Sequence, residues 1–242
     1  MFPPIRDKYS PDFIIANAEN SHEGRGVNRS IVQRLYDLDV DVITGGNHSF
    51  DKWKIFSYMK TDENLLRPMN YPKGNAGYGY GIYSVKDSDL KIGVLNLQGR
   101  TFMPQIDDPF TTADWALEKI KQETDIVFID FHAEATSEKM ALAHYLDGRV
   151  TAVIGTHTHV PTADEHILPG GTAYQSDAGM TGSRDSVIGV RKDIAIEKFV
   201  SQLPARFEAA KKDPILCGVL LDINESTGLC RSIERIHRGP DK

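Results

Sequence analysis

Cysteine is scarce in this sequence and shows no spacing typical of a metal or redox site. Only Cys217 and Cys230 occur in 242 residues, both in the last segment and outside any Cys-x-x-Cys pair. This excludes a cysteine-based zinc site and favours reduced thiols, as in cytosolic proteins. The two can also face each other across a terminal hairpin, so a disulfide between them stays open.

Long apolar runs and an excess of basic residues are also absent. No run approaches the roughly 20 apolar residues of a membrane-spanning helix, and charged residues begin at Arg6, so we expect no signal peptide in this segment. With 34 acidic and 28 basic residues, the net charge of -6 argues against a surface that binds nucleic acid by bulk positive charge. A small nucleotide is not excluded, because a metal can supply local positive charge. We therefore expect a cytoplasmic protein.

Strand and helix patterns alternate along most of the chain. The hydrophobic content of 40% and charged content of 26% are those of a globular protein, and no linker or repeat divides residues 1–242, so we expect a single domain. Polar turns predict two hairpins, at 82–97 and 215–236. We predict further strands at 13–16, 40–44, 125–131, 150–154 and 172–175, helices at 27–38, 52–60, 112–122, 137–146 and 193–202, and a loop at 74–81. The helix at 112–122 is expected to be capped by Thr111 or Thr112, and the helix at 137–146 by Ser137. This order favours an α/β fold of two packed mixed sheets flanked by helices.

Histidines follow two of the predicted strands. His132 comes after the apolar run at 126–129, and His157 and His159 follow the strand at 150–154. On an extended backbone, residues at i and i+2 point to the same face, so both histidines of the His-x-His can reach one site while Thr156 and Thr158 face away. Taken alone, His132 reads as a hydrogen-bonded core residue. Its place at a neighbouring strand end instead favours a shared metal site.

An amide and a further imidazole follow the strand at 40–44. Gly45 and Gly46 allow a sharp turn and a close approach before Asn47 and His48. Asn47 can bind a metal through its carbonyl oxygen, which leaves His48 free for proton transfer to a leaving group. Asp51 can fix the tautomer of His48. The alternative is a simple asparagine-containing turn.

A carboxylate at the end of the first predicted strand completes this set. Glu19 can bridge two metals, and Asn20 stands beside it. Carboxylate, amide and imidazole ligands without thiolate suit iron or manganese in a two-metal phosphoryl-transfer site better than structural zinc. Two such ions would lower the pKa of a bound water and clamp the phosphoryl oxygens, and His48 would protonate the departing oxygen.

Several other polar residues have weaker claims to a role. Glu134 can orient an imidazole through its second nitrogen, and Asp177 can support the site from a strand end. Arg25, between two glycines, can face a substrate phosphate or lie in a solvated turn. The remaining histidines have no paired ligands and are expected on the surface or in satisfied core positions: His22, His144, His166 and His237.

The Asn-His and His-x-His segments resemble motifs of a known enzyme family. Gly46-Asn47-His48 and the run 155–159 are similar to the GNH and GHxH boxes of calcineurin-like metallophosphoesterases. Four further segments resemble the bacterial YmdB-type subfamily, and the likeness runs from about Tyr9 to about Ile236. Those segments are 18–20, 96–100, 130–139 and 177–182.

The resemblance implies a phosphodiesterase for small cyclic nucleotides, 2',3'-cyclic ones in particular, with a dinuclear iron or manganese site in an α/β/β/α sandwich. It implies that Glu19 bridges the two metals and that a metal-bound hydroxide attacks phosphorus. His48 matches the proton donor. Asn20 and His159 are implied as ligands of the first metal, and Asn47, His132 and His157 as ligands of the second.

One departure from the family pattern bears on the first metal. Family members open with a strand carrying a Gly-Asp pair, whose aspartate binds that metal, whereas here Phe2 to Tyr9 resembles the end of the following helix. Two explanations are open: the gene product starts earlier, or this form is partly disabled. An uncovered sheet would also favour homo-oligomerisation.

Three functions therefore remain in view. The leading one is a dinuclear-metal phosphodiesterase acting on 2',3'-cyclic and, less directly, 3',5'-cyclic nucleotides. The departure at the first strand motivates a non-catalytic regulatory or scaffold homologue that binds metal poorly. A phosphomonoesterase or nucleotidase shares the metal motifs but prefers terminal phosphates.

Overall fold

The most apolar runs of the chain form one six-stranded mixed sheet. In the computed structural model, which describes residues 1–239, the four central strands of this sheet are parallel and the two edge strands are antiparallel to them. Helices cover one face and strands the other, so the central strands are buried almost throughout. The order across the sheet is β3 (Tyr80–Ser84), β4 (Lys91–Gln98), β5 (Val127–His132), β6 (Ala152–Thr156), β8 (Ala173–Gln175) and β7 (His166–Ile167).

A second layer of strands packs on one face of this sheet in two pieces. The first is the parallel pair β1 (Ile15–Asn17) and β2 (Val42–Thr44), which shares a buried cluster with β4. The second is antiparallel and packs against β6 and β8. It consists of β9 (Gly182–Ser183), β10 (Pro214–Ile223) and β11 (Cys230–Arg238).

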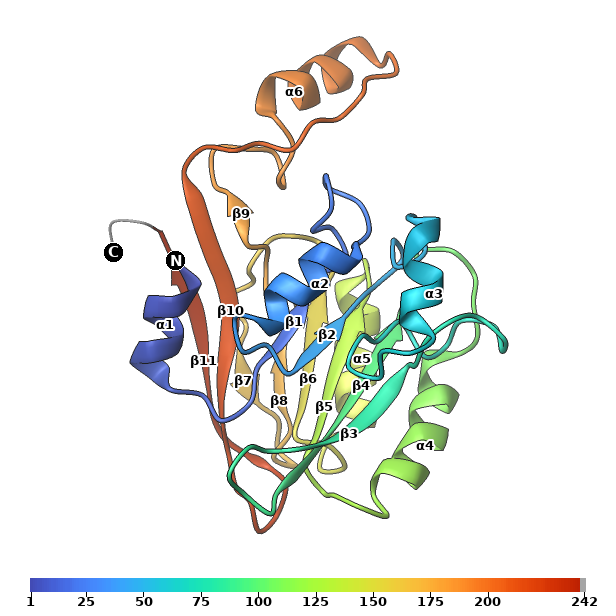
Figure 1. Cartoon of the computed structure of the whole chain (residues 1–242), viewed down its shortest axis with the longest axis vertical. Helices are drawn as coiled ribbons and strands as arrows, with labels where there is room; N and C mark the ends of the chain where they lie inside the picture. Colours follow the sequence, from blue (N-terminus) through green and yellow to red (C-terminus); the bar gives the residue numbers. More distant parts are fainter. Residues whose placement is uncertain (240–242) are drawn as a thin grey trace.

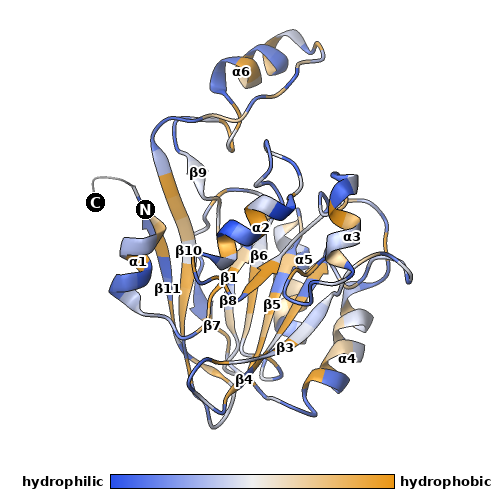
Figure 2. Ribbon diagram, in the orientation of Figure 1, coloured by the Kyte–Doolittle hydropathy of each residue, from blue (hydrophilic) through white to orange (hydrophobic). Residues whose placement is uncertain are grey.

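Helices form the two outer layers (Figure 1). The apolar sides of α4 (Pro109–Ile120) and α5 (Thr136–Tyr145) are buried against the free face of the large sheet. On the opposite side, α2 (Arg29–Tyr36) packs over β1 and β2 through Val32. The predicted α/β/β/α arrangement is therefore confirmed, and Figure 2 shows the apolar residues concentrated in the inner strands. Within residues 1–239, no helix is long and apolar enough to cross a membrane.

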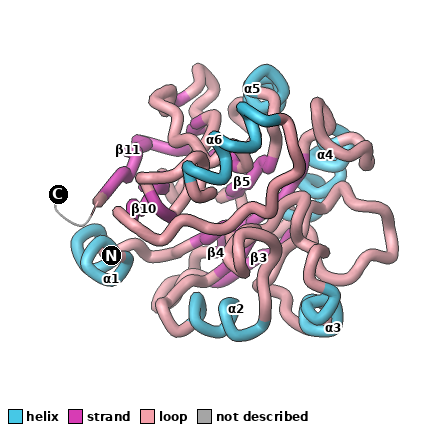
Figure 3. The backbone as a smooth tube through the Cα atoms, turned by 90° about the horizontal axis from the view of Figure 1, so that it is seen from above, coloured by secondary structure: helices cyan, strands magenta, loops and turns pink. Residues whose placement is uncertain are grey.

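The remaining helices lie at the periphery. They are α1 (Phe2–Tyr9), the 3-10 turn η1 (Trp53–Ile55), α3 (Phe56–Met59) and α6 (Lys192–Ser201). The last of these is carried on an arm, residues 184–213, that stands away from the sheets in Figure 1 and lies in front of them in the view from above in Figure 3. Phe199 and Val200 on this helix are 71% and 81% exposed.

Several local predictions were wrong. Asp108, not a threonine, caps α4, because its carboxylate accepts from the backbone N–H groups of Phe110 and Thr111. The helix α5 begins after Ala135 without a side-chain cap, so Ser137 is not its cap. The predicted helix at 52–60 is split into η1 and α3, and the end of the predicted loop at 74–81 belongs to β3.

The terminal hairpin leaves both cysteines as free thiols. Cys217 lies opposite His237, and Cys230 lies opposite Ile223, so the two thiols do not face each other across β10 and β11. Burial raises the pKa of the Cys230 thiol to about 11, which keeps it in the unreactive protonated form.

Candidate metal centre

The ends of four strands converge at one edge of the two layers. Glu19 follows β1, Asn47 and His48 follow β2, His132 ends β5 and His157 follows β6. The register pairs His132 with Thr156, so the histidines stand at adjacent ends of parallel strands as predicted. This is the edge at which α/β proteins gather polar ligands.

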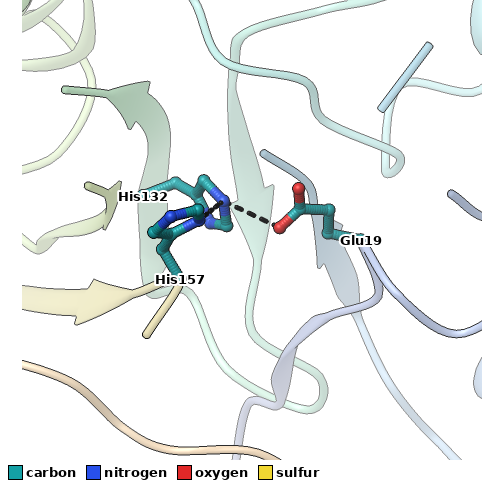
Figure 4. Close-up of side chains that lie close together, drawn as sticks. All are labelled: Glu19, His132 and His157. Carbon is teal, nitrogen blue, oxygen red and sulfur yellow. Dashed lines mark hydrogen bonds and ion pairs between the residues drawn. The ribbon is translucent and has the colours of Figure 1, made fainter. Parts of the chain in front are cut away.

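Glu19, His132 and His157 form the tightest group of potential ligands (Figure 4). Their ligand atoms all lie within 4.8 Å of one another. His132 Nε2 is 2.7 Å from Glu19 Oε2 and 3.0 Å from His157 Nδ1. Burial raises the pKa of Glu19, but the His132 imidazole and the His48 backbone N–H outweigh burial, so the pKa is lowered overall and the carboxylate stays ionised.

A buried relay orients His132. Its Nδ1 is 3.0 Å from Thr156 Oγ1, and that hydroxyl donates to Asp130 Oδ1 at 2.7 Å. Because the hydroxyl has a single proton, it must accept from His132 Nδ1–H, which leaves Nε2 with a lone pair when the ring is neutral. Asp130 is fully buried, and burial raises its pKa although Asn17, Thr44 and Thr156 donate to it. The prediction that Thr156 faces away from the site was therefore wrong.

His157 is positioned by Glu134, as predicted. His157 Nε2 lies 3.1 Å from Glu134 Oε2, so Nδ1 turns toward His132. Burial, and then the nearby His132, lower the pKa of His157 to about 4, which keeps the ring neutral and able to donate a lone pair. The backbone here is not extended, since φ is 104° at His157 and 66° at His159, so the expected alternation of the His-x-His does not hold.

Asn47 lies between the ligand group and His48. Its Oδ1 is 2.9 Å from His132 Nε2, and its Nδ2 is 3.2 Å from His48 Nε2. His48 Nδ1 is 2.9 Å from Asp51 Oδ2, so Asp51 fixes the tautomer as predicted. Gly46 makes the close approach possible, because a Cβ there would lie 2.4 Å from the His132 ring.

Asn20 and His159 form a second group beside the first. Asn20 Nδ2 is 2.9 Å from His159 Nε2, and His159 Nδ1 donates to the carbonyl of Ile188 at 2.8 Å. Asn20 Oδ1 is buried and has no hydrogen-bond partner among residues 1–239. Asn20 adjoins Glu19, the carboxylate predicted to bridge two metals, in the sequence.

The donor set fits a cation. Glu19 Oε2, Asn47 Oδ1, His132 Nε2 and His157 Nδ1 are electron-pair donors gathered within a few ångströms, and the relays described above place the ring protons on the outer nitrogens. Such a set repels itself unless a positive charge lies among its members. The unpaired Asn20 Oδ1 extends the same argument to the second group, because an unpaired buried carbonyl is costly.

A buried ion pair that sequence reasoning missed supports the His-x-His loop. Lys139 Nζ on α5 is 2.9 Å from Asp177 Oδ2, with both side chains at most 2% exposed. The same carboxylate oxygen accepts from the backbone N–H of Thr158, between the two histidines. Asp177 therefore has the supporting position predicted for it. Lys139 carried no signal, because a lysine in an amphipathic helix normally faces solvent.

The less favoured polar residues lie around the site without joining it. His22 bonds to Asn28 and not to the ligand group. Arg25 Nε is 3.4 Å from Asp51 Oδ2, so its guanidinium faces the partner of His48. His144, His166 and His237 are exposed, as predicted.

Comparison with known proteins places the chain in a family. The family model described as "YmdB-like protein" matches residues 1–236. The chain is 47% identical, over 97% of its length and 88% of the relative's, to "2',3'-cyclic-nucleotide 2'-phosphodiesterase" of Bacillus subtilis (strain 168).

Two solved structures are similar along nearly the whole chain. A hypothetical protein from Thermus thermophilus superposes with a TM-score of 0.90 at 39% identity, covering 98% of this chain and 91% of the other. A structure described as a novel phosphatase from Mycoplasma pneumoniae also superposes with a TM-score of 0.90. The two chains are 34% identical, and the match covers 98% of this chain and 85% of the other.

Proposed function

The chain belongs to the YmdB-like protein family, and from this membership we propose that it is a metal-dependent phosphodiesterase that hydrolyses small cyclic nucleotides. The observation that carries the proposal is the convergence of Glu19, His132 and His157 on one point. The name of the Bacillus subtilis relative supports 2',3'-cyclic nucleotides as the first substrates to test, ahead of 3',5'-cyclic ones.

The chain offers ligands for two ions that share Glu19. Asn47, His132 and His157 would hold one ion with Glu19, and Asn20 and His159 the other. When bound, ions of this kind activate a water and neutralise charge on the phosphoryl oxygens. Hard oxygen ligands mixed with imidazole favour iron or manganese.

His48 is proposed as the proton donor to the leaving oxygen. Asp51 holds its ring through Nδ1, and Nε2 lies beside Asn47. When the phosphodiester bond to the ribose oxygen breaks, the Nε2 proton passes to that oxygen, which leaves as a hydroxyl.

Replacing His48 by alanine tests this assignment. With Mn²⁺ or Fe²⁺ supplied and a chelator control, His48→Ala should lower turnover of 2',3'-cyclic AMP about 10²–10⁴-fold, the usual contribution of a general acid, while bound metal per chain stays the same. His22→Ala is the matched control, because His22 bonds to Asn28 outside the site and should leave turnover unchanged. Loss of metal in His48→Ala, or undiminished turnover, would contradict the proposed role.

The same assay separates the rival functions. Faster hydrolysis of a 3'-phosphate monoester than of the cyclic diester would identify a phosphomonoesterase. Absence of metal-dependent turnover from folded protein would favour the regulatory homologue.

A further inference from the structure

A cavity of about 550 Å³ lies beside the loop that carries His48. Aromatic side chains form much of its lining: Phe50, Phe56 and Tyr71, together with Ile106. Its volume lies within the range of sites that take small organic molecules. None of these residues belongs to the proposed metal ligands.

The cavity adjoins the proposed catalytic group. Phe50 follows His48 by two residues and shares its turn, so the chain that positions His48 also forms a wall of the cavity. Burial, and then the charges of Glu19 and Asp51, raise the pKa of Tyr71 to about 12. The charges of the Glu19 and Asp51 carboxylates therefore act on the phenol, which stays protonated.

The three rings hold one another in place. The ring centroids of Phe50 and Phe56 are 5.3 Å apart with an interplanar angle of 90°. Those of Phe50 and Tyr71 are 5.3 Å apart with an angle of 74°, so both contacts are edge-to-face. Phe56 nevertheless remains 37% exposed. Fixed, partly exposed rings suit a flat, polarisable ligand, because stacking adds contact area at little cost in side-chain entropy.

Two polar side chains line the same cavity. Asn75 Nδ2 donates to the carbonyl of Pro72 at 3.1 Å, so Asn75 Oδ1 is the atom that can accept from an amino group. Lys60 adds an ammonium group that can donate to a ring nitrogen or carbonyl. An aromatic wall with one acceptor and one donor matches the chemistry of a nucleobase.

We infer that this cavity binds the nucleobase of the substrate, with Phe56 as a specificity-determining residue. The inference rests on the proposed function, since it places the base beside His48 when the cyclic phosphate lies at the ligand group. Phe56 contacts the base by stacking, whereas the phosphate and ribose oxygens are left to the metal ligands and His48. A substrate without a base would lose this contact and nothing else.

A pair of substrates tests the inference. For Phe56→Ala we expect kcat/KM for 2',3'-cyclic AMP to fall about tenfold, mostly through KM, because base stacking on an aromatic ring is of that order. For methyl riboside 2',3'-cyclic phosphate, which keeps the ribose and the cyclic diester but has no base, kcat/KM should change less than about twofold. Phe56→Tyr should restore the value for 2',3'-cyclic AMP.

Trp53→Ala is the matched control. Trp53 is an aromatic residue three positions earlier, 73% exposed and outside the cavity lining, so its removal should affect neither substrate. Equal losses on both substrates in Phe56→Ala would overturn the inference, as would equal kcat/KM of the unaltered protein for both.

Binding of adenosine provides a readout independent of turnover. Calorimetry should detect adenosine binding to the unaltered protein, weakened about tenfold in Phe56→Ala and unchanged in Trp53→Ala. Adenosine binding without any hydrolysis would contradict the proposed function but uphold the nucleobase site. Hydrolysis without adenosine binding would overturn the nucleobase site and leave the proposed function standing.

Discussion

Thr156 has one hydroxyl proton, and the acceptor of that proton determines which nitrogen of His132 faces the site. The proton points to Asp130, so His132 must use its own Nδ1–H to reach Thr156 and present Nε2 to Glu19 and Asn47. Relays of this kind around metal-binding histidines fix the tautomer and raise ligand basicity.

Removing that hydroxyl should weaken metal binding. Thr156→Val keeps the shape of the side chain but leaves His132 Nδ1 and Asp130 Oδ1 unpaired, so we expect metal affinity to fall roughly 10- to 100-fold and the free energy of unfolding to fall by about 1–3 kcal/mol. Metal titration and urea denaturation measure the two effects.

Thr44→Val separates the two effects. Thr44 donates to the same buried carboxylate but does not contact His132. The Thr44→Val variant should therefore be less stable than the unaltered protein but keep its metal affinity. An equal loss of affinity in both variants would show that Asp130, and not the orientation of His132, controls the site.

The residues of the site were predictable to different degrees. Glu19, Asn47, His132 and His157 follow apolar runs, and the parallel strand order brings them together as expected. Asp130 could have been found as well, because it stands two residues before His132 on the same face of β5. The positive φ values at His157 and His159 could not, since they depend on the tertiary contacts of the loop, among them the bond from Thr158 N–H to Asp177.

At the scale of single elements, helix boundaries were predicted less well than helix positions. The pattern of apolar residues located α4 and α5, because that pattern reflects burial against the sheet. Their first residues depend on one local hydrogen bond, for which several nearby side chains compete. At α4 the competitor that forms the bond is Asp108, just before Pro109.

Replacing the cap should destabilise α4 measurably. Asp108→Ala removes bonds to two backbone N–H groups as well as an ion pair with Arg100, and we expect a loss of about 1 kcal/mol in the free energy of unfolding by urea. Asp108→Asn keeps the capping oxygen and should recover most of that stability. A larger loss in Thr111→Ala than in Asp108→Ala would restore the cap first predicted from the sequence.

At the scale of the whole molecule, the Lys139–Asp177 pair ties an outer helix to the loops beyond β6 and β8. Both charges are shielded from water, so removing one leaves the other buried without compensation. Lys139→Met should therefore lower the free energy of unfolding by roughly 3–5 kcal/mol, whereas the double variant Lys139→Met with Asp177→Asn should recover part of that loss.

An exposed ion pair serves as the comparison. Lys192→Met breaks the contact of Lys192 with Asp185, where both side chains are about half exposed, and should change stability by less than about 1 kcal/mol. Urea denaturation of the three variants measures these differences. A Lys139→Met protein as stable as the unaltered one would show that Asp177 finds another partner.

The layered architecture was predicted because it depends on the order of apolar runs, which the two hairpins and the parallel strands follow. The arm that carries α6 was not predicted, since a helix pattern does not show whether other elements cover the helix. Homo-oligomerisation stays a prediction, and light scattering tests it directly.

The arm has a further consequence for the lifetime of the native contacts around His159. The side-chain ion pairs around α6 stay within the arm, as between Arg191 and Glu208, so its amide hydrogens should exchange with solvent through local openings that leave β5 protected. Ile188, at the base of the arm, accepts the bond from His159 Nδ1. Each local opening that reaches Ile188 would also break its hydrogen bond with His159. The rate of amide hydrogen exchange in the arm therefore reports how long the His159 imidazole keeps its orientation.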